Sequence, residues 1–261
     1  MYDIVEDADA AAQISSSFYH RIHNRFHRFA TNRITKLADG IIVISSHLEA
    51  KFKNLTQKGI SLHFRPISVN MDQFPQVVQT PHKPITLFYA GSFGVKDGVE
   101  NIIDAFSILA SSRADLWLIL TGKGTPERMR VILDKIESSP VQDRIDYKGY
   151  LNDQEYYRTL NAIDIPCMTR IDSVYAYAGF PFKLGEFLAS GKPVIASAVG
   201  DVGKLLTDRV DAILVKPDSV DEVVSAVCYL LDHAENARQI GIAGRQRAIQ
   251  LFDYKVQGHN L

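Results

Sequence analysis

Six short apolar runs, separated by amphipathic segments, constrain the fold of this chain more than any other feature of its sequence. Each run is rich in β-branched residues and almost continuously apolar, as strands buried on both faces of a sheet are. The segments between them have helical periodicity and are long enough for parallel crossovers. The predicted strands are residues 85–91, 116–122, 145–149, 163–168, 193–197 and 212–215. The pattern predicts an α/β fold with a doubly wound, parallel six-stranded Rossmann-like domain, whose ligand crevice lies at the carboxyl ends of the strands.

The first eighty residues carry a weaker pattern. They contain a long amphipathic segment at about 15–38 and two short strand-like runs, GIIVISS and SLHFRPIS. Two strands are too few for an independent core. Residues 71–83 hold two prolines without a regular pattern, which indicates a linker. We therefore predict a partial α/β unit with a linker in residues 1–80, and the Rossmann-like domain in residues 81–245.

Charge and cysteine content exclude several classes of function. The chain has 29 Lys and Arg residues against 30 Asp and Glu residues, so its net charge of −1 offers nucleic acid no general attraction. Its two cysteines lie in separate apolar stretches, without the spacing of a disulfide framework or a zinc site. The N-terminal residues are acidic, and no apolar run approaches the roughly 18 residues that span a bilayer. These features favour a cytoplasmic protein, at most peripheral at the inner face of a membrane.

Two glycine-rich turns follow consecutive predicted strands. Residues 91–98, GSFGVKDG, contain Lys96, and residues 120–127, LTGKGTPE, contain Lys123. Glycine lets the backbone turn sharply, and the helix that follows offers free N–H groups to an anion. Taken alone, each turn could be an anion-binding loop or merely a tight connection from strand to helix. Neither has the spacing of a dinucleotide fingerprint or a Walker loop. Because both lie at the same edge of a parallel sheet, together they favour a phosphate or nucleotide crevice.

The strongest motif is AGFPFKLGEFLASGKPVIAS, residues 178–197. A glycine and a proline precede a helix that is predicted to begin near Phe182. Lys183 and Glu186 lie three residues apart on one face of that helix. At a helix N-terminus that opens on a crevice, the lysine could bind phosphate and the glutamate could bind ribose hydroxyls. The alternative is a surface ion pair between the two side chains.

Seven segments, spread over nearly the whole chain, carry a family resemblance. They are ADGIIVISSHLEAKF, VNMDQF, FYAGSFGVKDGVENIIDAF, LILTGKGTPE, IDYKGYLNDQEYYRTLNAIDI, PFKLGEFLASGKPVIAS and AILVKPDSVDEVVSAV. With these segments the chain resembles the retaining glycosyltransferases of family four, the group 1 type, which have the GT-B fold. The resemblance implies that the C-terminal domain binds a nucleotide-diphosphate sugar and that the N-terminal domain binds the acceptor. It also implies retention of the anomeric configuration, no bound metal and no other cofactor.

The resemblance assigns roles to individual residues. Lys183 and Glu186 are the implied catalytic pair, in which Glu186 matches the glutamate that binds the nucleotide ribose. Stabilisation of the departing diphosphate is the implied catalytic device. Gly149 and Tyr150 match the turn whose backbone contacts the base. The rest of the predicted donor site includes residues of both glycine-rich turns and of the loop before the helix at Phe182. It comprises Gly91, Ser92, Lys96, Gly122, Lys123, Gly149, Tyr150, Gly179, Phe180, Phe182 and Leu184.

Four positions depart from the family pattern. Ala178 stands where the first glutamate of a pair is expected, and Ser92 stands where an arginine is often found. Asp97 replaces an expected lysine, with Lys96 one place upstream, and Lys204 replaces a frequent glutamate. We expect Asp97 to weaken diphosphate binding, because like charges repel in a partly desolvated crevice. The three lysines of the predicted site could offset this loss.

The resemblance includes only the last part of the family's acceptor domain, and it ends at the start of a C-terminal crossover helix predicted for residues 246–261. We therefore predict the donor half of a glycosyltransferase of cell-surface polysaccharide or glycolipid synthesis, as a truncated chain or one partner of a split enzyme. Its expected partners are a sugar nucleotide, a lipid-linked or polysaccharide acceptor and a complementing acceptor-domain chain. The main alternative is an inactive nucleotide-binding half that regulates another chain. A third alternative, a GT-B epimerase, needs acidic and histidine residues at the domain cleft.

The segment of residues 15–36 allows two further interpretations. It has five Lys and Arg residues and no acidic residue, with Phe18, Ile22 and Phe26 on one helical face. It could lie against anionic lipid, or it could pack its apolar stripe on the acceptor domain. Three histidines share helical spacings that suit a metal ion: His20, His23 and His27. No carboxylate or cysteine nearby completes a ligand set, so we expect no metal site.

Overall fold

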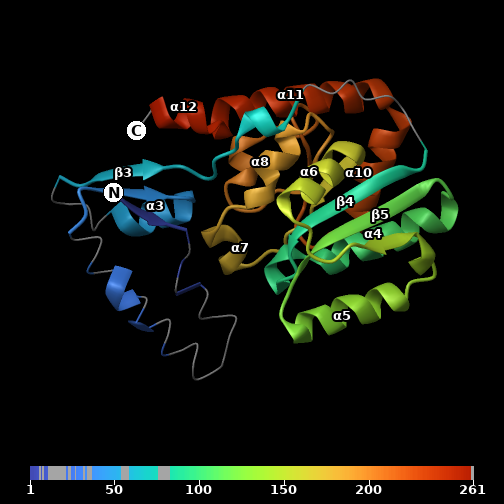
Figure 1. The fold of residues 1–261 in the computed structure, drawn as a ribbon, viewed down its shortest axis with the longest axis horizontal. Coiled ribbons are helices and arrows are strands. Elements are labelled where there is room, and N and C mark those ends of the chain that lie inside the picture. Colours follow the sequence, from blue (N-terminus) through green and yellow to red (C-terminus); the bar gives the residue numbers. More distant parts are fainter. Residues whose placement is uncertain are drawn as a thin grey trace.

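Two parallel sheets organise the computed structural model of this chain (Figure 1). The structure describes residues 1–5, 7, 9–10, 22, 25–26, 28–31, 33, 37–53, 59–75 and 83–259. The smaller sheet has the order β1-β2-β3, formed by Tyr2–Ile4, Gly40–Val43 and Ser61–Phe64. The larger sheet has the order β6-β5-β4-β7-β8-β9, formed by Ile85–Ser92 (β4), Leu116–Lys123 (β5), Ile145–Tyr147 (β6), Ile165–Met168 (β7), Ile195–Ser197 (β8) and Ile213–Val215 (β9). The predicted α/β fold with a six-stranded, doubly wound sheet is therefore confirmed, although four of the six strands are shorter than predicted.

The strand order of the larger sheet fixes where a crevice forms. The chain enters the sheet at β4, continues outward through β5 and β6, and then returns to the other side of β4 with β7. The connections on the two sides of this reversal diverge, which leaves space beyond the carboxyl ends of β4 and β7. The glycine-rich turn after β4 and the segment after β7 both lie at this point.

Helices cover both faces of the larger sheet. The helices from β4 onward are α4 (Val99–Ser112), α5 (Pro126–Glu137), α6 (Asp153–Ala162), α7 (Val174–Ala178), α8 (Phe182–Ala189), α9 (Val202–Leu205), α10 (Val220–Asp232), α11 (Ala234–Phe252) and α12 (Tyr254–His259), of which α12 lies over the smaller sheet. Alternate residues of β4 point to opposite faces. Leu87 and Tyr89 join a buried cluster with α4, α5 and α10, whereas Phe88 and Ala90 join a second cluster with α6 and α8.

The smaller sheet belongs to the second of these clusters. Ile4, Ile41 and Val43 are buried in the same cluster as Phe187 and Leu188 of α8. Two strands were predicted in this region, and β1 is a third that was not predicted. Three residues are too few to show the alternation by which a strand is recognised. The helix α3 (Ser46–Lys53) follows β2 and completes the described part of this region.

The C-terminal helices link the two regions. Figure 1 shows α11 and α12 running along both of them. The side-chain amide of Gln257 in α12 donates to the carbonyl of Ile67 at 2.7 Å and accepts from Ser68 at 2.6 Å. The predicted start of a C-terminal segment at residue 246 falls inside α11, which is a single helix of 19 residues.

The predicted helix at 15–38 is described only in part. Its described positions from Ile22 to Arg33 are helical, and Ile22 and Phe26 are exposed. Phe18 and the three histidines that could have bound a metal lie outside the described residues. Among the described helices, none combines the length and the apolar character needed to cross a membrane. The described His, Cys, Asp and Glu side chains form no group of three or more that could hold a metal ion.

Candidate functional site

Two adjoining hollows lie at the carboxyl ends of β4 and β7. The inner hollow, of about 100 Å³, is lined by Gly91 and Ser92 from the end of β4 and by Lys183 at the start of α8. The outer hollow, of about 230 Å³, is lined by Lys96, Gly179 and Phe180, together with Asp7 and neighbours from the smaller sheet. Both hollows are also lined by Ser92, Arg170 and Phe182. The structure thus places a polar crevice at the topological reversal of the sheet.

A glycine fastens the turn after β4 to the end of β7. Gly98 has a φ of +60°, and a Cβ atom on it would lie 2.0 Å from the carbonyl oxygen of Thr169. In return, the hydroxyl of Thr169 donates to the carbonyl of Gly98 at 2.9 Å. Only glycine meets both the backbone conformation and the close approach. This contact holds the two walls of the inner hollow together.

Asp97 is not a free anion in the crevice, which corrects the expectation that it opposes a diphosphate. Its carboxylate accepts a hydrogen bond from the hydroxyl of Ser92 at 2.5 Å and lies 3.6 Å from Nε of Arg170. Both charged side chains are only 8% exposed. The buried pair is electrically neutral as a whole, so the repulsion predicted from the sequence is largely cancelled.

Arg170 is a residue of the crevice that the sequence analysis missed. Burial lowers the pKa of its guanidinium, and the Asp97 carboxylate offsets part of that effect. A guanidinium remains protonated at neutral pH even so. The only sign of it in the sequence is a basic residue just after a predicted strand, in CMTRID. That strand, β7, pairs with β4, which carries the first glycine-rich turn.

Lys183 and Glu186 form the ion pair that was one of the two interpretations of their spacing. Nζ of Lys183 lies 2.8 Å from Oε2 of Glu186 and 3.8 Å from the ring centre of Tyr156. The hydroxyl of Tyr156 donates to the same carboxylate oxygen at 2.6 Å. Oε1 receives only a 3.5 Å contact from Tyr157. Burial, and then the Glu186 charge, raise the pKa of Tyr156 well above its usual value, so the phenol stays a donor.

The predicted residues at the ends of β5 and β6 form a second group. Gly122 donates its N–H to the carbonyl of Gly149 at 2.9 Å, and Nζ of Lys123 lies 4.5 Å from the ring centre of Tyr150. These residues lie on the same edge of the sheet as the hollows. Gly122 pairs with Gly91 across β4 and β5, with a φ of +141° that brings the two backbones into contact. The structure therefore brings both glycine-rich turns together.

The remaining predicted residues differ in what they can present to a ligand. Nζ of Lys96 lies 3.9 Å from the ring centre of Tyr175, at the rim of the outer hollow. The side chains of Phe180 and Leu184 are buried in the second core cluster, so these two residues can reach a ligand mainly through their backbone. Phe182, by contrast, is 58% exposed.

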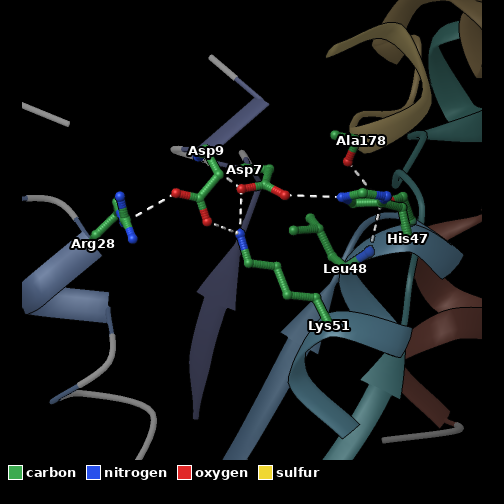
Figure 2. Close-up of polar contacts among 8 residues, drawn as sticks. Asp7, Asp9, Arg28, His47, Leu48, Lys51 and Ala178 are labelled. Atoms are coloured by element: carbon green, nitrogen blue, oxygen red, sulfur yellow. Dashed lines mark hydrogen bonds and ion pairs between the residues drawn. The ribbon is translucent and has the colours of Figure 1, made fainter. Parts of the chain in front are cut away.

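The smaller sheet contributes a charged network to the outer hollow (Figure 2). Asp7, just beyond β1, is buried and lies 2.9 Å from Nε2 of His47 while also contacting Nζ of Lys51. Asp9 extends the network to Lys51 at 2.8 Å and to Arg28 at 2.9 Å. Burial acts to raise the pKa of Asp7, but the hydrogen bonds from Lys51 and His47 outweigh it and lower the pKa. The Asp7 carboxylate is therefore fixed in place by His47 and Lys51. It was not predicted from the sequence.

Comparisons with known proteins point to the same part of the chain. Residues 70–247 match the family model described as glycosyl transferases group 1. The MMP alpha-(1->4)-mannosyltransferase of Mycolicibacterium hassiacum is 28% identical over 195 residues, which cover 74% of this chain and 45% of that protein. The glycogen synthase of Mycobacterium tuberculosis is 22% identical over 85% of this chain and 52% of its own length. The chain spans about half the length of these curated relatives.

Solved structures share the fold. Sucrose-phosphate synthase from Thermosynechococcus elongatus has a TM-score of 0.79 at 23% identity, covering 99% of this chain and 65% of its own. Anabaena HepE in complex with UDP-glucose has a TM-score of 0.77 at 16% identity, covering 99% of this chain and 70% of its own. At these identities the likeness shows the GT-B fold alone. Because the family model matches most of the sequence, the chain belongs to the group 1 glycosyl transferases.

Proposed function

We propose that this chain binds a nucleotide-diphosphate sugar in the crevice between β4 and β7 and serves as the donor part of a retaining glycosyltransferase. The observation that carries the proposal is the pair of hollows at the topological reversal, lined by the Gly91 turn and by the start of α8. Family membership supports the same chemistry, and HepE, which shares the fold, was solved with UDP-glucose.

The proposed catalytic role of the crevice is electrostatic. Cleaving the sugar–phosphate bond leaves negative charge on the nucleoside diphosphate, and fixed cations lower the free energy of that charge. Lys183 lines the inner hollow at the N-terminal end of α8, where the helix dipole also favours an anion. Glu186 lies one turn further along α8, with Oε1 only weakly engaged, and we assign this oxygen to a ribose hydroxyl. In this proposal no metal is needed.

Calorimetric titration with UDP, GDP and ADP tests the donor site. We expect one nucleotide to bind, and Glu186→Gln to weaken that binding about tenfold to a hundredfold through loss of a charged hydrogen-bond partner. Glu235→Gln is the matched control, because Glu235 forms an ion pair at the same spacing, with Arg238 on the exposed surface of α11. If none of the three nucleotides binds, or if both variants behave alike, the proposed donor site is wrong.

One observation favours the alternative of an inactive nucleotide-binding half. Ala178 replaces the first glutamate of the family pair, and its backbone carbonyl accepts a hydrogen bond from Ser45 at 2.7 Å. Turnover separates the two candidates. A transferase hydrolyses or transfers the sugar when an acceptor domain is supplied, whereas an inactive half binds the nucleotide without releasing sugar. The same turnover assay, run with a polysaccharide or a lipid-linked acceptor, tests the proposed acceptor.

A further inference from the structure

Arg170 carries a buried guanidinium that the contacts of the folded chain leave incompletely satisfied. Its Nη1 is buried and has no hydrogen-bond partner within the described part of the chain. Its ion-pair partner, Asp97, lies 3.6 Å from Nε, on a different nitrogen. Buried charged donors are almost always hydrogen-bonded, because an unpaired donor loses its hydrogen bonds to water and gains none in the protein. A buried donor without a partner at the wall of two hollows therefore points to a bound acceptor group.

The unpartnered side of this guanidinium faces the loop before α8. Nη1 lies 4.0 Å from the position that a Cβ atom would occupy on Gly179. Gly179 and Arg170 line the outer hollow together, and Arg170 also lines the inner one. Because residue 179 is a glycine, it places no side chain against Nη1. Arg170 lines both hollows, so an acceptor group in either one lies beside this residue.

The charges around the hollows favour an anion at this place. Three cationic side chains line them, Lys96, Arg170 and Lys183. The two carboxylates that line the hollows are both paired with cations. Asp97 accepts a hydrogen bond from Ser92 and faces Arg170, and Asp7 is paired with Lys51. A guanidinium presents its N–H groups in a planar fork that matches two phosphate oxygens, which an ammonium cannot do.

We propose that Arg170 donates from Nη1 to the diphosphate of the sugar nucleotide, and that Asp97 and Ser92 hold the guanidinium in position for it. This inference rests on the proposed function and names the residue that contacts the leaving group. The family resemblance places an arginine at position 92, at the end of β4. In this chain a serine stands there and the cation comes from beyond β7, on the opposite wall of the same crevice.

The test compares nucleotides that differ only in phosphate number. The double variant Arg170→Gln with Asp97→Asn removes the buried pair without leaving a lone charge. We expect it to weaken binding of the nucleoside diphosphate about tenfold to a hundredfold, and binding of the nucleoside without phosphate by less than about twofold. The matched control is Arg247→Gln with Asp211→Asn, a second arginine–aspartate pair, 3.9 Å apart and outside the two hollows. The control should bind both ligands as the unchanged protein does.

The outcomes separate this inference from the proposed function. If the unchanged protein binds no nucleoside diphosphate, the proposed function fails and the inference fails with it. If it binds and the Arg170 variant binds equally well, only the inference is overturned. A crystal structure of the unchanged chain with the nucleoside diphosphate gives a readout that needs no variant. Nη1 within about 3.2 Å of a phosphate oxygen supports the inference, and a longer separation from every phosphate oxygen overturns it.

Discussion

The two sheets of this molecule reach stability in different ways. The six-stranded sheet has helices on both faces, and one buried cluster, built around Leu87 and Phe106, consists entirely of its own residues and helices. Among the residues that the structure describes, the three-stranded sheet has no such cluster, because Ile41 and Val43 are buried together with residues of α8 and α11. A parallel sheet needs cover on both faces. The larger sheet brings its own cover, whereas the smaller one depends on its neighbour.

That dependence shapes the crevice. The junction lies beside the hollows, where Ser46 donates to Asp201 through its backbone N–H at 2.6 Å and through its hydroxyl at 2.5 Å. On the other side of the junction, Ile67 and Val69 pack directly on Gly185 of α8. Since Asp7 and its neighbours line the outer hollow, docking of the smaller sheet determines the shape of that hollow.

The largest effect is expected in the core that the larger sheet has to itself. Phe106→Ala should lower the free energy of unfolding by about 3–5 kcal/mol, because it removes a fully buried ring and leaves a cavity. Both sheets should then unfold together in chemical denaturation, since the smaller one loses its support. Ile108→Ala, an exposed position on the same helix, is the control and should change little. Survival of the smaller sheet after the larger one unfolds would contradict the dependence.

The next effect should fall on the junction alone. A Cβ atom on Gly185 would lie 2.5 Å from Cδ1 of Ile67 and 2.7 Å from Cγ2 of Val69. Gly185→Ala should therefore push the smaller sheet away at a cost of about 1–3 kcal/mol. Hydrogen exchange should speed up in β1–β3 but not in β4 and β5. At Gly203, also in a helix, a Cβ atom would find only ordinary contacts, so Gly203→Ala should alter neither sheet.

Acid should loosen the smaller sheet before it unfolds the larger one. Burial acts to raise the pKa of Asp201, but hydrogen bonds from Ser46 and Lys204 outweigh it and lower the pKa below its ordinary value of 3.8. Such a carboxylate stabilises the fold above its unfolded pKa and loses that contribution as the pH falls through the folded pKa. Below about pH 4, proteolysis near the junction should quicken while the fluorescence of Trp117, the only tryptophan, keeps its folded signal. In Asp201→Asn the smaller sheet should be loosened already at neutral pH. An unchanged rate of proteolysis at neutral pH would contradict the stabilising role of Asp201.

The smallest effect is expected at the exposed edge of the larger sheet. Lys123 lies over the ring of Tyr150, which is 69% exposed. Lys123→Ala should lower the free energy of unfolding by about 0.5–1 kcal/mol, because a solvated cation–π contact is weak. Tyr150→Phe keeps the ring and should have a smaller effect. A loss above 2 kcal/mol would mean that this edge belongs to the core after all.

The same comparison explains what the sequence could and could not predict. The six strands were predictable because each is a continuous apolar run, and the crevice followed from their order. The strand β1 was not, since Tyr2–Ile4 shows too few residues for a pattern. Asp97 was predicted to be an unpaired anion, because its partner Arg170 follows another strand and only the folded structure brings the two together. Charge pairing across a sheet cannot be predicted from local spacing.

The contact between Gly98 and Thr169 also bears on when the crevice can form. The two residues are 71 positions apart in the chain, and the turn after β4 cannot be held in place until β7 has paired with β4. Closing a loop of that length costs conformational entropy, and the contacts that offset this cost form only when the central strands pair. A chain still emerging from the ribosome therefore has no crevice until β7 and α8 have been made. Ligand binding can assist only the final stage of folding.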